Sequence, residues 1–153
     1  MKILIAYDGS ANADHAIAVA GKLFPGAEAL VVHAWEPVAL AAARAAVYLP
    51  DYGDGQASID REREQAEGVA RQGAELATAA GLTASSAALQ ATGPLWAAIV
   101  DCIAEEHPDL TVMGTRGLTG VRGALAGSVS HAVVSHAHAP VLTVPLEEPA
   151  RKR

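Results

Sequence analysis

The sequence is poor in cysteine, aromatic residues and charge, and each shortage excludes a class of protein. Its single cysteine, Cys102, rules out an intramolecular disulfide and a cysteine-based zinc site. Aromatic residues make up only 4% of the chain, which leaves few rings to stack on nucleic-acid bases. Charged residues make up 18%, and the net charge is −6, with one basic run at 151–153. Because a phosphate backbone is bound by clustered Lys and Arg, we expect no nucleic-acid partner.

The sequence also lacks a long hydrophobic run. No stretch of about 18 uninterrupted apolar residues occurs, so no membrane-spanning helix is expected. Asp8 interrupts the apolar N-terminal segment where a signal peptide would need its apolar region. Together with the scarcity of cysteine, these features predict a protein of a reducing compartment, the cytoplasm, with no membrane partner.

What the chain does have is a regular alternation of short apolar runs and helical periodicity. Its 153 residues, 51% of them hydrophobic, suit one domain with a substantial core. The apolar runs predict strands, and spacings of three and four predict helices between them. Ser10 is expected to cap the start of the first helix, and Gly81 is expected at the C-terminal end of the helix within 58–80. On the first helix this spacing places Ala13 and Ile17 on the buried face and Asn12 on the opposite face. The strands are expected at 3–7, 29–35, 85–90, 109–114 and 140–144, and the helices at 13–24, 58–80, 94–107 and 128–138, with a further short helix within 37–55.

This alternation predicts the fold class. Short apolar strands separated by helices are typical of a parallel sheet covered on both faces. Right-handed crossovers then lead to an α/β, Rossmann-like, doubly wound five-stranded parallel sheet. We expect one domain over residues 1–147, followed by a short tail at 148–153.

Ligands of such a sheet bind beyond the C-terminal ends of its strands. Asp8 follows the first strand directly, and a glycine-rich loop follows the fourth strand. In that loop, Gly114 and Gly117 allow the backbone to approach a ligand closely, because they have no Cβ. Gly127 and Ser128 open the last helix, whose unpaired amides and dipole form an anion site suited to phosphate. The hydroxyls of Ser128 and Ser130 can add hydrogen bonds.

This loop matches neither of the common phosphate-binding motifs. It contains no lysine, so it is not a P-loop, and the Gly-x-Gly-x-x-Gly dinucleotide fingerprint is absent. The pattern Gly114-x-x-Gly117, nine residues, then Gly127-Ser128 instead resembles the ATP-binding signature of the universal stress protein family. The opening strand with Asp8, the segment 31–34 and the closing strand 140–144 are similar to those of the same family, and the likeness covers nearly the whole chain except 37–55.

The resemblance implies a strand order of 3-2-1-4-5, edge-to-edge homodimers through the last strand, and a role in stress response or regulation. It implies ATP as ligand, with or without Mg²⁺ or Mn²⁺. By the same resemblance, Asp8 contacts the ribose, and the main chain of Ala34 meets the adenine edge. The other implied contacts are those of Ala6 and Tyr7 beside the adenine, Met113 and Gly114 flanking the sugar and phosphates, and Gly117, Gly127, Ser128, Val129 and Ser130 around the phosphates.

Simpler interpretations of these residues stay open. Asp8 can serve only to cap the first turn, and the glycines can serve only to shape a loop. Core packing is an equally good interpretation of Ala6, Tyr7, Ala34 and Met113. The alternative functions are an ATP-hydrolysing or adenylating enzyme that uses the same crevice, and a nucleotide-free interaction module. The sequence offers no evident base or nucleophile near the loop, so no catalytic residue is assigned. His131, His136 and His138 lack the spacing of a helical metal pair, and no metal ligands are assigned.

Overall fold

The computed structural model describes residues 1–45, 55–115 and 128–146 of the chain. They form a five-stranded sheet in which all pairs are parallel, with the order β3-β2-β1-β4-β5, as expected. All five predicted strands are present, within two residues of the expected ends. Their bounds are β1 Lys2–Ala6, β2 Glu28–Trp35, β3 Thr83–Gln90, β4 Leu110–Gly114 and β5 Val141–Val144.

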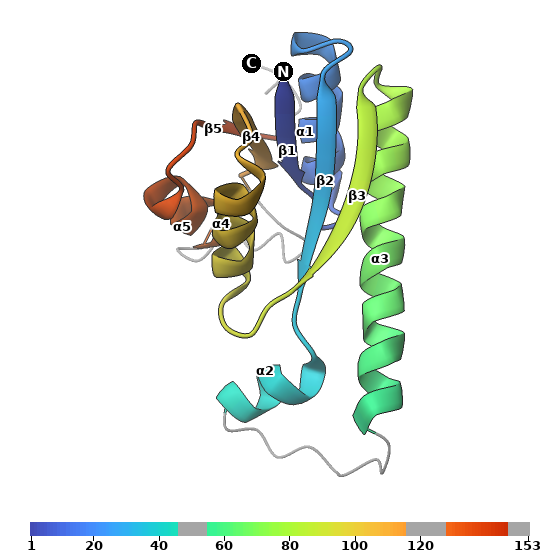
Figure 1. Ribbon diagram of the computed structural model, residues 1–153, viewed down its shortest axis with the longest axis vertical. Helices are drawn as coiled ribbons and strands as arrows, with labels where there is room; N and C mark the ends of the chain where they lie inside the picture. The colour runs from blue at the N-terminus through green and yellow to red at the C-terminus, as the bar shows by residue number, and fades with distance from the viewer. Residues whose placement is uncertain (46–54, 116–127, 147–153) are drawn as a thin grey trace, which may run out of the picture.

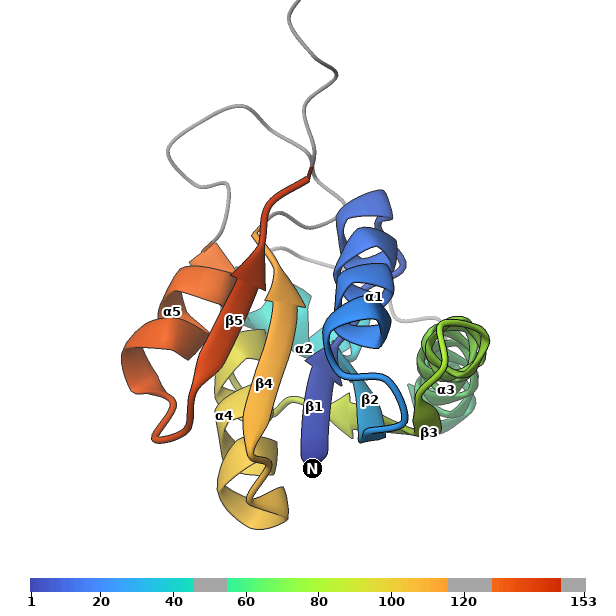
Figure 2. The same ribbon diagram turned by 90° about the horizontal axis from the view of Figure 1, so that it is seen from above.

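The helices cover both faces of the sheet. Figure 2 shows α1 and α3 on one face and α4 and α5 on the other. The short helix expected within 37–55 is α2; it buries no residue and lies away from the sheet, beside the N-terminal half of α3 (Figure 1). The bounds are α1 Ala11–Leu23, α2 Val38–Arg44, α3 Gly55–Ala79, α4 Leu95–Glu106 and α5 Ser128–His136. Among the described residues, no helix is long and apolar enough to cross a membrane.

Each face of the sheet has its own apolar core. Under α1 and α3, Ile3, Ile5 and Val31 are fully buried, because alternate side chains of one strand point to the same face. Under α4 and α5, Leu4 and Val32 pack against Ile99 and Ile103 of α4. Cys102 belongs to this second core and is 7% exposed, so it packs there as a small buried residue.

Local signals set several boundaries correctly. Ser10 is the N-cap of α1, and its hydroxyl accepts a hydrogen bond from the Ala13 amide at 3.2 Å. Gly81, expected at the C-terminal end of α3, has a φ of +91°, a conformation that side chains with a Cβ adopt rarely.

Other local expectations were wrong. Asn12 was expected on the exposed face of α1 but is 4% exposed, because the C-terminal ends of β4 and β5 lie against that face. Pro94 is the N-cap of α4 rather than its first residue. The long helix α3 begins at Gly55, three residues before the expected start. The helix α4 ends at Glu106, one residue before the expected end, and its C-cap His107 has a φ of +46°, where a glycine is more common.

Candidate functional site

The C-terminal edge of the sheet contains a step between β1 and β2. The two strands pair only as far as Ala6 opposite Val32, and the Tyr7 amide then donates to the Val32 carbonyl at 2.9 Å. Beyond this point β2 continues to Trp35 and, of the described strands, pairs there with β3 alone. The end of β1 therefore leaves one side of the last residues of β2 without a neighbouring strand.

The main chain of Ala34 faces into this step. Along a parallel strand, the amide and carbonyl of one residue point to the same side, and successive residues alternate. The Val32 carbonyl faces β1, whereas the Trp35 carbonyl faces β3, where it accepts from the Ala91 amide at 2.8 Å. The amide and carbonyl of Ala34 consequently point toward β1, past the end of that strand. A flat ligand that offers one donor and one acceptor can pair with both groups.

Asp8 lies in the turn that carries the chain from β1 into α1. Its Oδ1 accepts a hydrogen bond from the Ser10 amide at 3.0 Å, and Gly9 between them has a φ of +78°. Because Ser10 caps α1, this turn fixes the carboxylate at the end of β1 and beside the start of the helix. Asp8 is half-buried. The predicted turn-forming role is present, and it leaves the carboxylate at the edge where a ligand would bind.

Asn12 ties the C-terminal ends of the last two strands to α1. Its Nδ2 donates to the Val144 carbonyl at 2.9 Å, and its Oδ1 accepts from the Thr115 hydroxyl at 3.4 Å. The Thr115 amide donates to the same Val144 carbonyl at 3.1 Å. A Cβ on Gly114 would lie 2.8 Å from the Asn12 Cγ, so glycine is required for this approach. The start of the loop after β4 is thus held by a buried amide.

The first turn of α5 joins the same edge. The helix begins at Ser128, and the hydroxyl of Ser130 donates to the Thr115 carbonyl at 3.4 Å. The half-buried Val129 packs against the core under α4 and α5. The first amides of an α-helix have no partner within the helix and carry partial positive charge. A helix start placed beside the ends of β1 and β4 can accept an anion.

The side chain of Tyr7 lies in the core rather than at the edge. It is 2% exposed, and its hydroxyl donates to Asp14 Oδ1 at 2.8 Å. A Cβ on Gly73 would lie 2.7 Å from the Tyr7 ring, so this glycine lets α3 approach it. Burial, reinforced by the hydrogen bond to Asp14, raises the pKa of Tyr7 above its ordinary value. The Tyr7 carbonyl lies 2.9 Å from Nδ1 of His33, so only the main chain of Tyr7 borders the step.

The structure brings most of the predicted site residues to one edge. Ala6 and Met113 are paired across β1 and β4, and Met113 is 5% exposed in the core. Gly117 and Gly127 lie outside the described residues, as does the side chain of Ser128. The predicted residues at this edge are Ala6, Tyr7, Asp8, Ala34, Met113, Gly114, Val129 and Ser130, together with the backbone of Ser128.

Sequence reasoning missed the role of Asn12 at this edge. Helical periodicity alone places it with His15 and Lys22, on the face away from Ala13 and Ile17. The available signal was its position, because a polar residue in the first turn after the first strand faces the C-terminal ends of neighbouring strands. Thr115, which directly follows Gly114, is its hydrogen-bond partner.

No group of three or more His, Cys, Asp or Glu residues suited to a metal ion occurs within the described residues. Of the three histidines near the end of the chain, His136 packs on an aromatic ring. His136 stacks on Trp96 with ring centroids 4.4 Å apart, and its Nδ1 lies 2.8 Å from the Ala132 carbonyl.

Comparison with known proteins shows which family the chain resembles. The model of the universal stress protein family matches residues 1–145. A universal stress protein of Thermus aquaticus is 41% identical over 147 residues, which cover 93% of this chain and 96% of that protein.

Two solved structures of universal stress proteins share the fold. One, in complex with cAMP, is 26% identical, with a TM-score of 0.65 over 94% of this chain and 96% of that one. The other, from Archaeoglobus fulgidus in complex with dAMP, is 20% identical, with a TM-score of 0.62 over 94% of this chain and 96% of that one. The extent of the family match and the 41% identity to a curated member lead to one conclusion: the chain belongs to the universal stress protein family.

Proposed function

We propose that this protein binds an adenine nucleotide, ATP, at the C-terminal edge of the sheet. The observation that carries the proposal is the step in the sheet at Ala34. Adenine offers an exocyclic amine donor next to a ring-nitrogen acceptor on its Watson–Crick edge. The carbonyl and amide of Ala34 provide the complementary pair, in the place that a continued β1 would occupy. The cAMP and dAMP complexes of related proteins support adenine as the base.

The remaining parts of the nucleotide fall on residues at the same edge. The Asp8 carboxylate, fixed by its hydrogen bond from the Ser10 amide, is the acceptor for the ribose hydroxyls. The start of α5 at Ser128 is the anion site for the phosphates, with Val129 and Ser130 in its first turn. Gly117 and Gly127 complete the phosphate contacts in this proposal. A divalent ion, Mg²⁺ or Mn²⁺, would then be held mainly by the phosphate oxygens.

Two substitutions test the base and ribose contacts separately. Ala34→Pro removes the amide that faces the step but leaves the β2–β3 hydrogen bonds intact, because those use the neighbouring residues. Asp8→Asn keeps an oxygen for the Ser10 amide but removes the charge. We expect both to weaken ATP binding in equilibrium dialysis, Asp8→Asn about tenfold or more and Ala34→Pro about threefold to tenfold. A hydrogen bond to a charged group is worth about 1.5–3 kcal/mol, whereas one between neutral groups is worth about 0.5–1.5 kcal/mol. Asp101→Asn on α4 is the matched control and should bind as the parent does.

The parent protein should also gain thermal stability with ATP and Mg²⁺, since a ligand that binds only the folded state stabilises it. Absence of any thermal shift at millimolar ATP would contradict the proposal. Parent-like affinity in both Ala34→Pro and Asp8→Asn would place the nucleotide elsewhere. Parallel titrations with AMP and cAMP decide which adenine nucleotide is preferred.

We further propose that the protein forms homodimers through β5. This edge strand contains half-buried Val141 and Leu142, and the large apolar side chains of Val134 and Leu146 nearby are 50% and 42% exposed. The Val144 carbonyl faces β4, so the Thr143 amide faces outward. Thr143→Pro should therefore shift the protein from dimer to monomer in analytical ultracentrifugation, with little loss of stability. A monomeric parent would contradict this assignment.

In this proposal the bound nucleotide serves regulation in a cytoplasmic stress response rather than turnover. ATP is positioned by a main-chain pair, one carboxylate and a helix start. The carboxylate is assigned to the ribose, so this proposal places no general base at the terminal phosphate. ATP hydrolysis well above background, lost in Asp8→Asn, would instead establish an enzyme.

A further inference from the structure

The other edge of the sheet carries a second surface suited to binding. The outermost strand β3 pairs only with β2 among the described residues, in an unbroken register of eight residues. Proteins usually protect such an edge with charges, proline or a bulge, because its free amides and carbonyls attract another strand. The eight residues of β3, Thr83 to Gln90, include no charged residue and no proline.

The free main-chain groups of β3 can be assigned to particular residues. The Thr83 and Ala91 amides donate to carbonyls on the β2 side. Since the direction alternates along the strand, the amides and carbonyls of Ala84, Ser86 and Ala88 point outward. They form a row of donors and acceptors along the edge.

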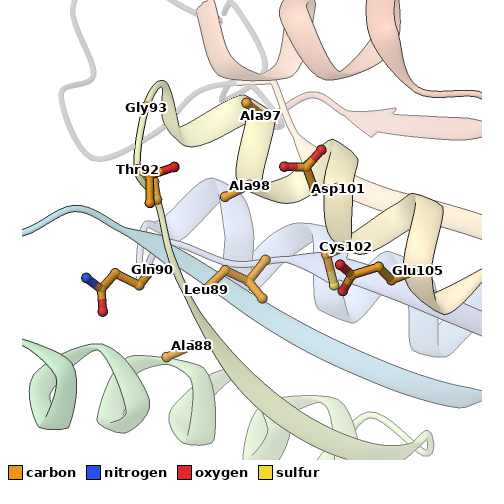
Figure 3. Close-up of a pocket in the computed structure, with 11 residues that line it drawn as sticks. Ala88, Leu89, Gln90, Thr92, Gly93, Ala97, Ala98, Asp101, Cys102 and Glu105 are labelled. Atoms are coloured by element: carbon orange, nitrogen blue, oxygen red, sulfur yellow. The ribbon is translucent and has the colours of Figure 1, made fainter.

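A groove of about 300 Å³ adjoins this row, between β3 and α4 (Figure 3). Its walls are mostly small residues, including Ala88, Ala97 and Ala98. Asp101 and Glu105 of α4 also line it, and both side chains are exposed. None of the described residues that line the groove is basic. The groove therefore combines room beside a strand edge with two negative charges.

The spacing of the two carboxylates matches that of an added strand. Asp101 and Glu105 are one helical turn apart, about 6 Å along α4. Alternate side chains of a strand, which point to the same face, are about 6.6 Å apart. A strand paired with β3 would thus present every second side chain toward the two carboxylates.

We propose that the β3 edge binds an extended segment of a partner protein that carries basic side chains at alternate positions. The segment adds a sixth strand, with main-chain hydrogen bonds to the outward groups of β3. Its two basic side chains pair with Asp101 and Glu105. The aliphatic parts of these side chains lie against Ala97 and Ala98 in the groove. This surface lies on the opposite edge of the sheet from β5.

The experiment uses a fluorescein-labelled hexapeptide, Thr-Lys-Val-Arg-Val-Thr, and a matched peptide with glutamate in place of both basic residues. Fluorescence anisotropy at low salt measures binding to the full chain. The parent should bind the basic peptide at least tenfold more tightly than the acidic one. This preference should decrease as salt is added, because the charges are exposed.

Two protein variants separate the strand contact from the charge contact. Ala88→Pro removes one outward amide but no β2–β3 bond, and should weaken binding of the basic peptide about fivefold. The double variant Asp101→Asn, Glu105→Gln should weaken it by a similar factor at low salt and reduce the salt dependence. Thr143→Pro, the corresponding change at the other edge, should bind the peptide as the parent does.

Equal binding of the two peptides by the parent, or no binding of either, would overturn the proposal. So would parent-like affinity in the double variant, which also decides the matter if Ala88→Pro does not fold. A change of oligomeric state in Ala88→Pro alone would assign the edge to a second copy of this chain and overturn the proposed partner.

Discussion

The two ends of the sheet are held together by different kinds of interaction. At the C-terminal end, the buried Asn12 amide bonds to the Val144 carbonyl and the Thr115 hydroxyl. At the N-terminal end, the Lys2 ammonium bonds to the Glu106 carboxylate at 2.7 Å, with side chains 35% and 41% exposed. A buried polar group is costly when it loses its partner, whereas an exposed ion pair exchanges readily with water. The buried amide at the C-terminal end should therefore contribute more to stability than the exposed ion pair at the N-terminal end.

The largest expected effect comes from crowding the C-terminal end. In Gly114→Ala, the new Cβ would lie 2.8 Å from the Asn12 Cγ and 3.2 Å from the Asn12 carbonyl carbon. It should push Asn12 off its hydrogen bonds and lower the free energy of unfolding by about 3 kcal/mol, measured by urea denaturation. The control is Gly68→Ala in α3, where a Cβ meets nothing within 4 Å. It should stabilise the helix by about 0.5–1 kcal/mol.

A somewhat smaller effect is expected from removing the buried amide itself. Asn12→Ala deletes the bonds to Val144 and Thr115 and should cost about 2 kcal/mol in the same measurement. Nucleotide affinity should fall as well, because the start of the loop after β4 loses its anchor. A variant as stable as the parent would contradict the comparison between the two ends.

Tyr7, at the end of β1, gives a test at alkaline pH. Its raised pKa means that the folded state keeps the phenolic proton after the unfolded state has lost it. Stability should consequently fall as the pH rises above about 10, the ordinary pKa of tyrosine. Tyr7→Phe should lose about 1 kcal/mol at neutral pH with the bond to Asp14. It should also show a shallower alkaline decline in thermal melts from pH 9 to 11, and an unchanged decline would remove Tyr7 as its source.

The smallest effect is expected at the N-terminal end. The hydrogen bond from the exposed Lys2 ammonium to Glu106 raises the pKa of Lys2 above its ordinary 10.5. The contribution of the pair is present at neutral pH and is lost as the pH rises through the raised pKa of Lys2. Lys2→Met should change the melting temperature by less than about 2 °C at pH 7. A decrease in melting temperature as large as that of Asn12→Ala would contradict the comparison between the two ends.

Much of the fold could be predicted from signals that depend on residues close together in the sequence. The apolar run at 3–7 was recognised as a strand because it is buried on both faces and needs no alternation. Ser10 and Gly81 were recognised as helix ends because capping depends on a few adjacent residues. The start of α3 was missed by three residues because its first turn is largely polar, and apolar spacing is absent there.

The candidate site was predicted less completely. Asp8 was predicted from its position directly after the first strand, whereas Ala34 came from the resemblance to the family. The structure supplies a physical reason for Ala34 through the place where β1 stops. Asn12 could not be found from periodicity, because its burial depends on Val144, a residue 132 positions away. Tyr7 could not be assigned to the core from its position alone, because that depends on the close approach of Gly73 in α3.

The sequence by itself determined the strands, most of the helices and the family, because apolar spacing, capping residues and the glycine pattern act within short stretches of chain. Only the tertiary structure decided which main-chain groups are left open. The groups of Ala34 are open because β1 ends earlier than β2, and those of Ala88 are open because β3 pairs with β2 alone among the described residues. Both facts depend on how strands distant in sequence align, and a hydrogen-bonding group becomes available for binding only where a neighbouring strand is missing.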